Sequence, residues 1–211
     1  MAIQRCTRAA IGIKEMLFIL LSLVSASISG FVCAAEKNAG RNDMAELCFD
    51  CHGADNTTSD PLVPKLNGQL RSFLVKQTKY YMSGERSDTV MSSVIGKFNL
   101  SEKNIAEIAD FFSRLPVMKG TGNMTALGKK GRLVFIEQKC IFCHEEADSS
   151  VASYIGETVI IGGQNKAYLI KSMVDIRNRA RIADGFDLMS KTVKHLSDDD
   201  IEAIAEYLSA I

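Results

Sequence analysis

The sequence predicts an all-α protein built from two similar halves in tandem. Motifs recur in the same order in both parts of the chain, which indicates a duplicated domain. Each half closes with apolar residues at the i, i+3, i+4 and i+7 spacing of an amphipathic helix, and no stretch shows the alternation of a half-buried strand. With 46% hydrophobic and 24% charged residues among 211, the composition is that of an ordinary globular protein.

The first 35 residues have the order of a secretory signal peptide. Basic residues precede an apolar run over 16–24, and small residues follow as far as Ala35. This order predicts export and cleavage, and the apolar run is short for a membrane anchor. The segment holds three basic residues and one acidic residue, so cleavage before Glu36 leaves 22 basic and 24 acidic residues from 25 of each. That balance has no basic excess that would favour nucleic acid.

Matching positions define the repeat. Four pairs of them are Cys48 and Cys140, Gln69 and Gln164, Arg86 and Arg181, and Ser101 and Ser197. The offset between the halves grows from 92 residues at the first pair to 96 at the last, which small loop insertions explain. A run rich in glycine after Pro116 breaks the periodic pattern. The sequence therefore predicts a first domain over 36–115, a linker over 116–126 and a second domain over 127–211.

The two closing helices carry start signals. Ser101 and Ser197 suit the N-cap position, and Asp200, three residues after Ser197, approximates a capping box. Helices are therefore predicted to begin directly after both serines.

Each half holds one Cys-x-x-Cys-His motif, the attachment signature of a c-type haem. The thioether residues are predicted to be Cys48, Cys51, Cys140 and Cys143, and the histidines bound to iron are predicted to be His52 and His144. Two haems would also supply apolar core to halves that are small for independent stability. The alternatives are a four-thiolate zinc site, a thioredoxin-like dithiol and two disulfides. Zinc leaves the histidines unexplained, and a redox dithiol normally lies in a strand–helix context.

A methionine is the predicted second axial ligand in each half. Met91 lies ten residues before Ser101, and Met189 lies eight before Ser197. The other methionines are interpreted as packing or linker residues. His195 is the alternative ligand to Met189, although a solvated position before the last helix is the favoured interpretation.

Three arginines, at 177, 179 and 181, form a basic stretch in the second half. A solvated helix end is the favoured interpretation of this stretch. Docking of an acidic partner and neutralisation of haem propionates are the alternatives. The propionate role is favoured for Arg86 and Arg181 because they recur.

These motifs resemble the class I cytochromes c, and specifically the two-haem cytochrome c4 group, over nearly all of the predicted mature chain. The residues that carry the resemblance are Cys48-x-x-Cys51-His52-Gly53, Pro64-Lys-Leu66-Asn-Gly68-Gln69, Met91 and Leu100-Ser101. The resemblance implies two all-α class I cytochrome c domains, each wrapped around one covalently bound haem. It also implies a periplasmic electron carrier that is not an enzyme, with the Pro64 carbonyl held against the proximal histidine.

The second half departs from this pattern. The stretch Val159-Ile-Ile161-Gly-Gly163-Gln164 contains no proline, and Glu145 stands where the family has glycine. We therefore expect unequal haem environments. The same departure makes the chain similar to the haem subunit of flavocytochrome c sulfide dehydrogenase, so an electron-accepting subunit is the alternative function. A dihaem peroxidase is less favoured, because it requires an iron with an open or displaceable ligand.

The expected partners are redox proteins that donate or accept electrons. A terminal oxidase, a cytochrome bc complex and a flavoprotein subunit are the candidates, reached through transient contact with membrane complexes in a respiratory chain. Nucleic acid is not an expected partner.

Overall fold

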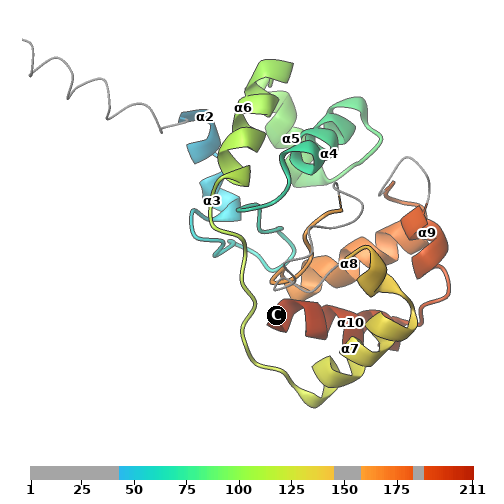
Figure 1. The fold of residues 1–211 in the computed structure, drawn as a ribbon. Helices are drawn as coiled ribbons and strands as arrows, with labels where there is room; N and C mark the ends of the chain where they lie inside the picture. Colours follow the sequence, from blue (N-terminus) through green and yellow to red (C-terminus); the bar gives the residue numbers. More distant parts are fainter. Residues whose placement is uncertain (1–42, 145–157, 183–187) are drawn as a thin grey trace, which may run out of the picture. The chain divides into compact units, whose positions relative to one another are not determined.

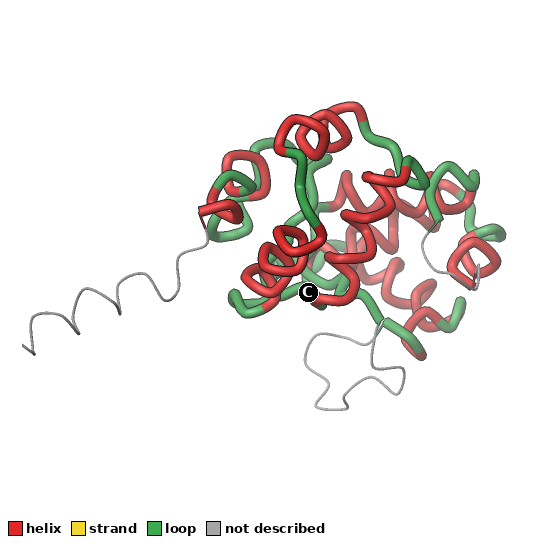
Figure 2. The backbone as a smooth tube through the Cα atoms, turned by 90° about the horizontal axis from the view of Figure 1, so that it is seen from above, coloured by secondary structure: helices red, strands yellow, loops and turns green. Residues whose placement is uncertain are grey.

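Helices and loops make up the backbone of the computed structural model, which describes residues 43–144, 158–182 and 188–211. No strand occurs in these ranges, and Figure 2 shows only helix and loop there. The predicted all-α fold class is confirmed. The predicted signal peptide over 1–35 lies outside the described residues.

Five helices form the first half. They are α2 (Asp43–Glu46), α3 (Phe49–His52), α4 (Arg71–Ser83), α5 (Thr89–Phe98) and α6 (Glu102–Ser113). Helix α6 packs against α2 and α4, while α5 packs against α4. Their core joins Ala45, Leu74, Ala109 and Phe112, and the ring of Phe49 lies 5.5 Å from that of Phe112 in an edge-on contact.

The second half repeats this plan from α7 onward. Its elements are α7 (Ala126–Glu137), the 3-10 turn η1 (Cys140–Phe142), α8 (Lys166–Arg177), α9 (Leu188–Val193) and α10 (Asp198–Ala210). Helix α10 packs against α7 and α8, and α9 packs against α8. In the described ranges helices contact only helices of their own half, and Figure 1 shows the blue-to-green and yellow-to-red helices as two groups.

The predicted starts of the closing helices are confirmed. The hydroxyl of Ser101 accepts a hydrogen bond from the backbone N–H of Asn104, whose side chain accepts one from Ser101 N–H. Ser197 and Asp200 form the same reciprocal box before α10. Each box satisfies N–H groups that the first turn of a helix leaves without partners.

The segment between the halves is held against both of them. Met118 in this segment is 2% exposed. Gly68 and Gly163 both adopt positive φ, and a Cβ on Gly68 would lie 2.3 Å from the Cα of Val117. Both glycines also donate their N–H to the closing helix of their own half. The segment over 116–125 therefore packs against both halves, and we call it the strap. Helix α7 begins at Ala126, within the range predicted for the linker.

Residues 42–211 form one unit by their contacts. Within the part of the chain that the structure describes, every helix is too short or too polar to span a bilayer.

We expect Gly131→Ala to destabilise the protein, because α7 and α10 meet at this residue. A Cβ there would lie 1.8 Å from the carbonyl oxygen of Ala203 on α10, so the helices would have to separate. Overpacking of this kind costs roughly 1–3 kcal/mol. The measurement is the denaturant midpoint of the holoprotein.

Gly96→Ala is the matched control, since a Cβ on this α5 residue meets nothing within 4 Å. Its stability should be unchanged or should rise by up to about 1 kcal/mol from helix propensity. Equal effects of the two substitutions would contradict the close crossing of α7 and α10.

Candidate functional site

The first Cys-x-x-Cys-His motif folds as one tight helical turn. Cys48 caps α3, and its carbonyl accepts hydrogen bonds from the N–H of Cys51 at 3.3 Å and of His52 at 2.9 Å. These bonds bring the two thiols and the imidazole to one short stretch of backbone. Gly53 closes the turn with φ of +71°, where a Cβ would lie 2.3 Å from the Thr57 carbonyl oxygen. Glycine is therefore required at this position.

The second motif makes the same turn around η1. The carbonyl of Cys140 accepts from the N–H of Cys143 at 3.1 Å and of His144 at 2.8 Å. The turn is entered through Lys139, which has φ of +63°. Glu145, which replaces the glycine of the first motif, lies outside the described residues. Both predicted motifs thus place two cysteines and a histidine on one turn of the backbone.

Each motif histidine is buried and bound to a backbone carbonyl. Nδ1 of His52 lies 2.7 Å from the carbonyl oxygen of Pro64, and Nδ1 of His144 lies 3.2 Å from that of Val159. A carbonyl only accepts, so Nδ1 carries the proton and Nε2 keeps its lone pair. Val159 stands four residues before Gly163, as Pro64 does before Gly68. The expected carbonyl contact is therefore present in the second half without the proline.

The electrostatics favour the metal-binding form of both imidazoles. Burial lowers the pKa of His52 and of His144, and the carbonyl bond to each ring opposes this only in part. A neutral imidazole with a fixed Nδ1–H is the form that binds iron through Nε2. Burial likewise raises the pKa of Cys48 to about 11, so this side chain is a neutral thiol.

The two predicted methionines stand at equivalent places in the fold. Met189 lies in the first turn of α9, and its sulfur is 3.5 Å from Nε2 of His144. Met91 lies in the first turn of α5, where the Asp88 carboxylate accepts a hydrogen bond from its N–H at 3.0 Å. His195 is exposed just before α10, as the favoured interpretation expected.

Zinc and disulfide bonding at the cysteine pairs find no support in the described ranges. In the described ranges, no three His, Cys, Asp or Glu side chains gather as a metal site, and the four motif cysteines form no disulfide. Each pair instead stays within its own half, beside its own histidine.

A buried polar cluster joins the halves through Arg86 and Arg181. Both guanidinium groups donate to Gln77 Oε1, at 2.6 and 3.1 Å, and to the Tyr168 hydroxyl, at 3.1 and 3.4 Å. Burial by itself raises the pKa of Tyr168, but Arg181 and Arg86 oppose this more strongly and lower it to about 8. Among the described residues, the acceptors that the two guanidinium groups bind, Ser172 included, are neutral.

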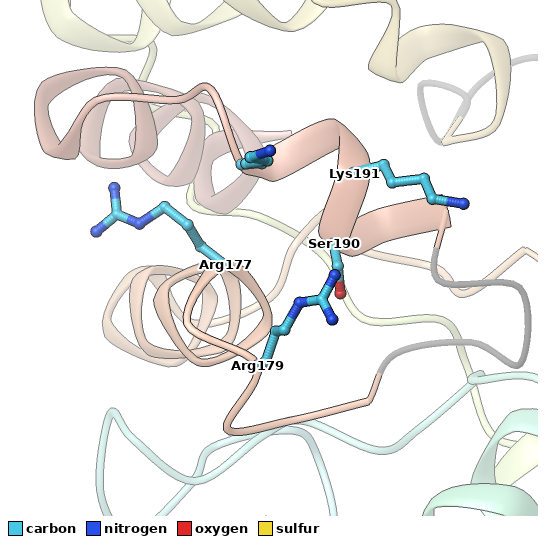
Figure 3. A pocket seen from close by; sticks show the side chains of 5 residues that line it. Arg177, Arg179, Ser190 and Lys191 are labelled. Carbon is cyan, nitrogen blue, oxygen red and sulfur yellow. The ribbon is translucent and has the colours of Figure 1, made fainter.

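The favoured interpretation of Arg177, Arg179 and Arg181 as a solvated helix end is wrong for Arg181, which is 8% exposed and belongs to the buried cluster. The other two arginines line a hollow of about 410 Å³ between the end of α8 and α9, together with Ser190, Lys191 and Lys194 (Figure 3). Arg177 also pairs with Asp198 at 2.6 Å and donates to the Leu196 carbonyl at 2.9 Å.

Sequence reasoning missed the roles of Gln77 and Tyr168 in the cluster. Gln77 has no repeated counterpart, since serine occupies the equivalent position 172. Tyr168 aligns with Phe73, and its extra hydroxyl was the one feature of the sequence that indicated a polar contact here. The recurrence of Gln69 and Gln164 was also visible, but no pattern in the sequence shows what they bind.

Known proteins are similar to this chain in sequence and in fold. A family described as "Cytochrome C oxidase, cbb3-type, subunit III" matches residues 126–208. Cytochrome c4 of Pseudomonas aeruginosa is 30% identical over 205 residues, which cover 94% of this chain and 98% of the relative. Cytochrome c4 of Stutzerimonas stutzeri is 30% identical over 216 residues, with coverages of 94% and 99%.

The structural comparison agrees. The crystal structure of reduced recombinant cytochrome c4 from Pseudomonas stutzeri superposes with a TM-score of 0.69 at 29% identity, covering 82% of this chain and 100% of that one. The similarity extends through both halves, each with its own Cys-x-x-Cys-His turn. The chain therefore belongs to the cytochrome c4 family, whose members carry two haem c groups and transfer electrons rather than act as enzymes.

Proposed function

We propose that this cytochrome is a periplasmic carrier that passes electrons between redox proteins of a respiratory chain. The observation that supports this best is the state of the two motif histidines. Each is buried and neutral, with its Nδ1 proton on a backbone carbonyl and Nε2 available as a ligand. In the second half the sulfur of Met189 lies beside that nitrogen.

The residues present suit two covalently bound haems. Thioethers would form at Cys48 and Cys51 in the first half and at Cys140 and Cys143 in the second, with His52 and Met91, and His144 and Met189, as axial ligands. Haem bound in this way supplies an iron that gains and loses one electron. The protein contributes the fixed ring orientation of each histidine, the exclusion of water and the electrostatic surroundings.

The buried cluster between the halves fits the carboxylates of haem. Gln77 Nε2 and Arg181 Nε are buried donors without a partner in the described structure. They stand with two guanidinium groups whose bound acceptors are neutral. A donor-rich buried cluster of this kind favours anionic groups.

Two ligands from the chain at each iron would leave no position for a substrate. This is why a carrier is favoured over a peroxidase, which needs an open or displaceable ligand. Delivery to the periplasm would follow from the predicted signal peptide, with the mature chain beginning near Glu36.

The first test is a haem count and a spectrum of the exported protein. We expect two haems per chain, low-spin iron and the weak red band of iron–methionine bonding in the oxidised form. Replacement of both Cys140 and Cys143 by Ser should leave one covalent haem, and the same change at Cys48 and Cys51 should leave the other. Intact mass reports the haem number and the mature N-terminus together. A high-spin component in the wild type would contradict closure of both irons by methionine.

A redox titration should resolve two one-electron steps. The Nδ1–oxygen distance is 2.7 Å at His52 and 3.2 Å at His144, so His144 is the weaker electron donor to its iron. A weaker donor stabilises ferric iron less, so the second haem should have the higher potential. Assigned NMR signals of the two haems would show the order of reduction. A single unresolved step would contradict unequal environments.

The proposed partners can be tested by cross-linking in the native periplasm and membrane fraction, followed by mass spectrometry. We expect capture of a terminal oxidase or a cytochrome bc complex, through a weak contact that is lost without the cross-linker. Stable copurification with a flavoprotein would instead identify the chain as an electron-accepting subunit.

A further inference from the structure

Two buried glutamines each bind the backbone of the opposite half. Gln164 Oε1 accepts from the N–H of Lys65 at 2.8 Å, and its Nε2 donates to the carbonyl of Lys65 at 3.1 Å. Gln69 does the same to Ile160, with distances of 3.0 and 2.8 Å. These two glutamines therefore make four hydrogen bonds across the halves, in two matching pairs.

The residues they bind are the ones that follow the histidine acceptors. Lys65 follows Pro64, and Ile160 follows Val159. The carbonyl of Pro64 and the N–H of Lys65 belong to one peptide group, which is bound by His52 on its oxygen side and by Gln164 on its nitrogen side. In the second half, one peptide group likewise joins His144 to Gln69.

The glutamine side chains are well placed to hold these peptide groups. Gln69 is 3% exposed and Gln164 is 5% exposed. Each Oε1 also accepts from the N–H of the next residue, at 3.0 Å, directly before α4 or α8. The amide is thereby fixed to the start of a helix in its own half while it binds the other half.

We infer that Gln164 and Gln69 are positioning residues for the proximal histidines, each acting on the histidine of the opposite half. This inference rests on the proposed role of His52 and His144 as iron ligands. A donor on the peptide oxygen and an acceptor on its N–H polarise the group in the same direction, and such chains of hydrogen bonds strengthen one another. Each glutamine therefore strengthens the carbonyl as an acceptor for Nδ1–H.

Each glutamine should affect the reduction potential of the haem in the opposite half. A strong Nδ1–H bond makes the imidazole a better electron donor and favours ferric iron. Loss of Gln164 should raise the potential of the haem at His52, although Gln164 belongs to the second half. Loss of Gln69 should raise the potential of the haem at His144.

The experiment compares Gln164→Leu with Gln69→Leu in the full two-haem protein. The readouts are the two potentials and the exchange of the Nδ1 proton of each motif histidine with deuterated water, followed by NMR. We expect Gln164→Leu to raise the first potential and speed exchange at His52, and Gln69→Leu to act on the second haem and His144. Each variant is the control for the other.

Further variants separate this role from general loosening. Gln138→Leu changes an exposed glutamine at the end of α7 and should leave both potentials unchanged. If Gln164→Leu fails to fold, Gln164→Asn takes its place. It keeps the amide but shortens the side chain by one methylene, and it should show the effect expected of Gln164→Leu, a raised first potential and faster exchange at His52. Shifts of both haems in every variant, or of neither, would overturn the inference. A wild-type spectrum without histidine–methionine ligation would instead overturn the proposed function.

Discussion

The hydrogen bond from each motif histidine to a backbone carbonyl is the contact on which the rest of the site depends. It fixes the Nδ1 proton, and thereby leaves the lone pair of Nε2 for iron. The carbonyl keeps its place against the buried ring only while its peptide group is held in this orientation. In both halves a glutamine from the opposite half binds the N–H of that peptide. Ligand geometry in one half is thus tied to the docking of the other.

The duplicated plan makes these contacts reciprocal without making them equal. Gln69 and Gln164 stand at matching places, so the same bonds cross in both directions. The differences lie in single residues. The second half has Val159 where the first has Pro64, and Ser172 where the first has Gln77. A longer Nδ1–oxygen distance accompanies the first of these changes. A carrier with two unequal irons has a preferred site for its first electron, and small changes of this kind in the ligand surroundings are sufficient to establish one.

Close contacts between the helices hold the two haem motifs in place. Helices α7 and α10 meet at Gly131, and α6 and α10 begin in capping boxes that fix where their buried faces start. The strap between the halves packs against Gly68 and Gly163, the residues directly before the bridging glutamines. The strap and the glutamines therefore meet in one region between the halves.

The sequence by itself determined the all-α class, the duplication, the two haem motifs and the starts of α6 and α10, because these depend on local spacing that a one-dimensional pattern records. It also predicted Met91 and Met189 as iron ligands from their order before the closing helices. The tertiary structure decided what Gln69, Gln164, Gln77 and Tyr168 bind, and that Arg181 is buried rather than solvated. The contacts of these residues that cross between the halves join positions 82 to 104 residues apart. Their partners are backbone groups or guanidinium groups brought close only when the halves pack, and no periodicity or motif spacing encodes that proximity.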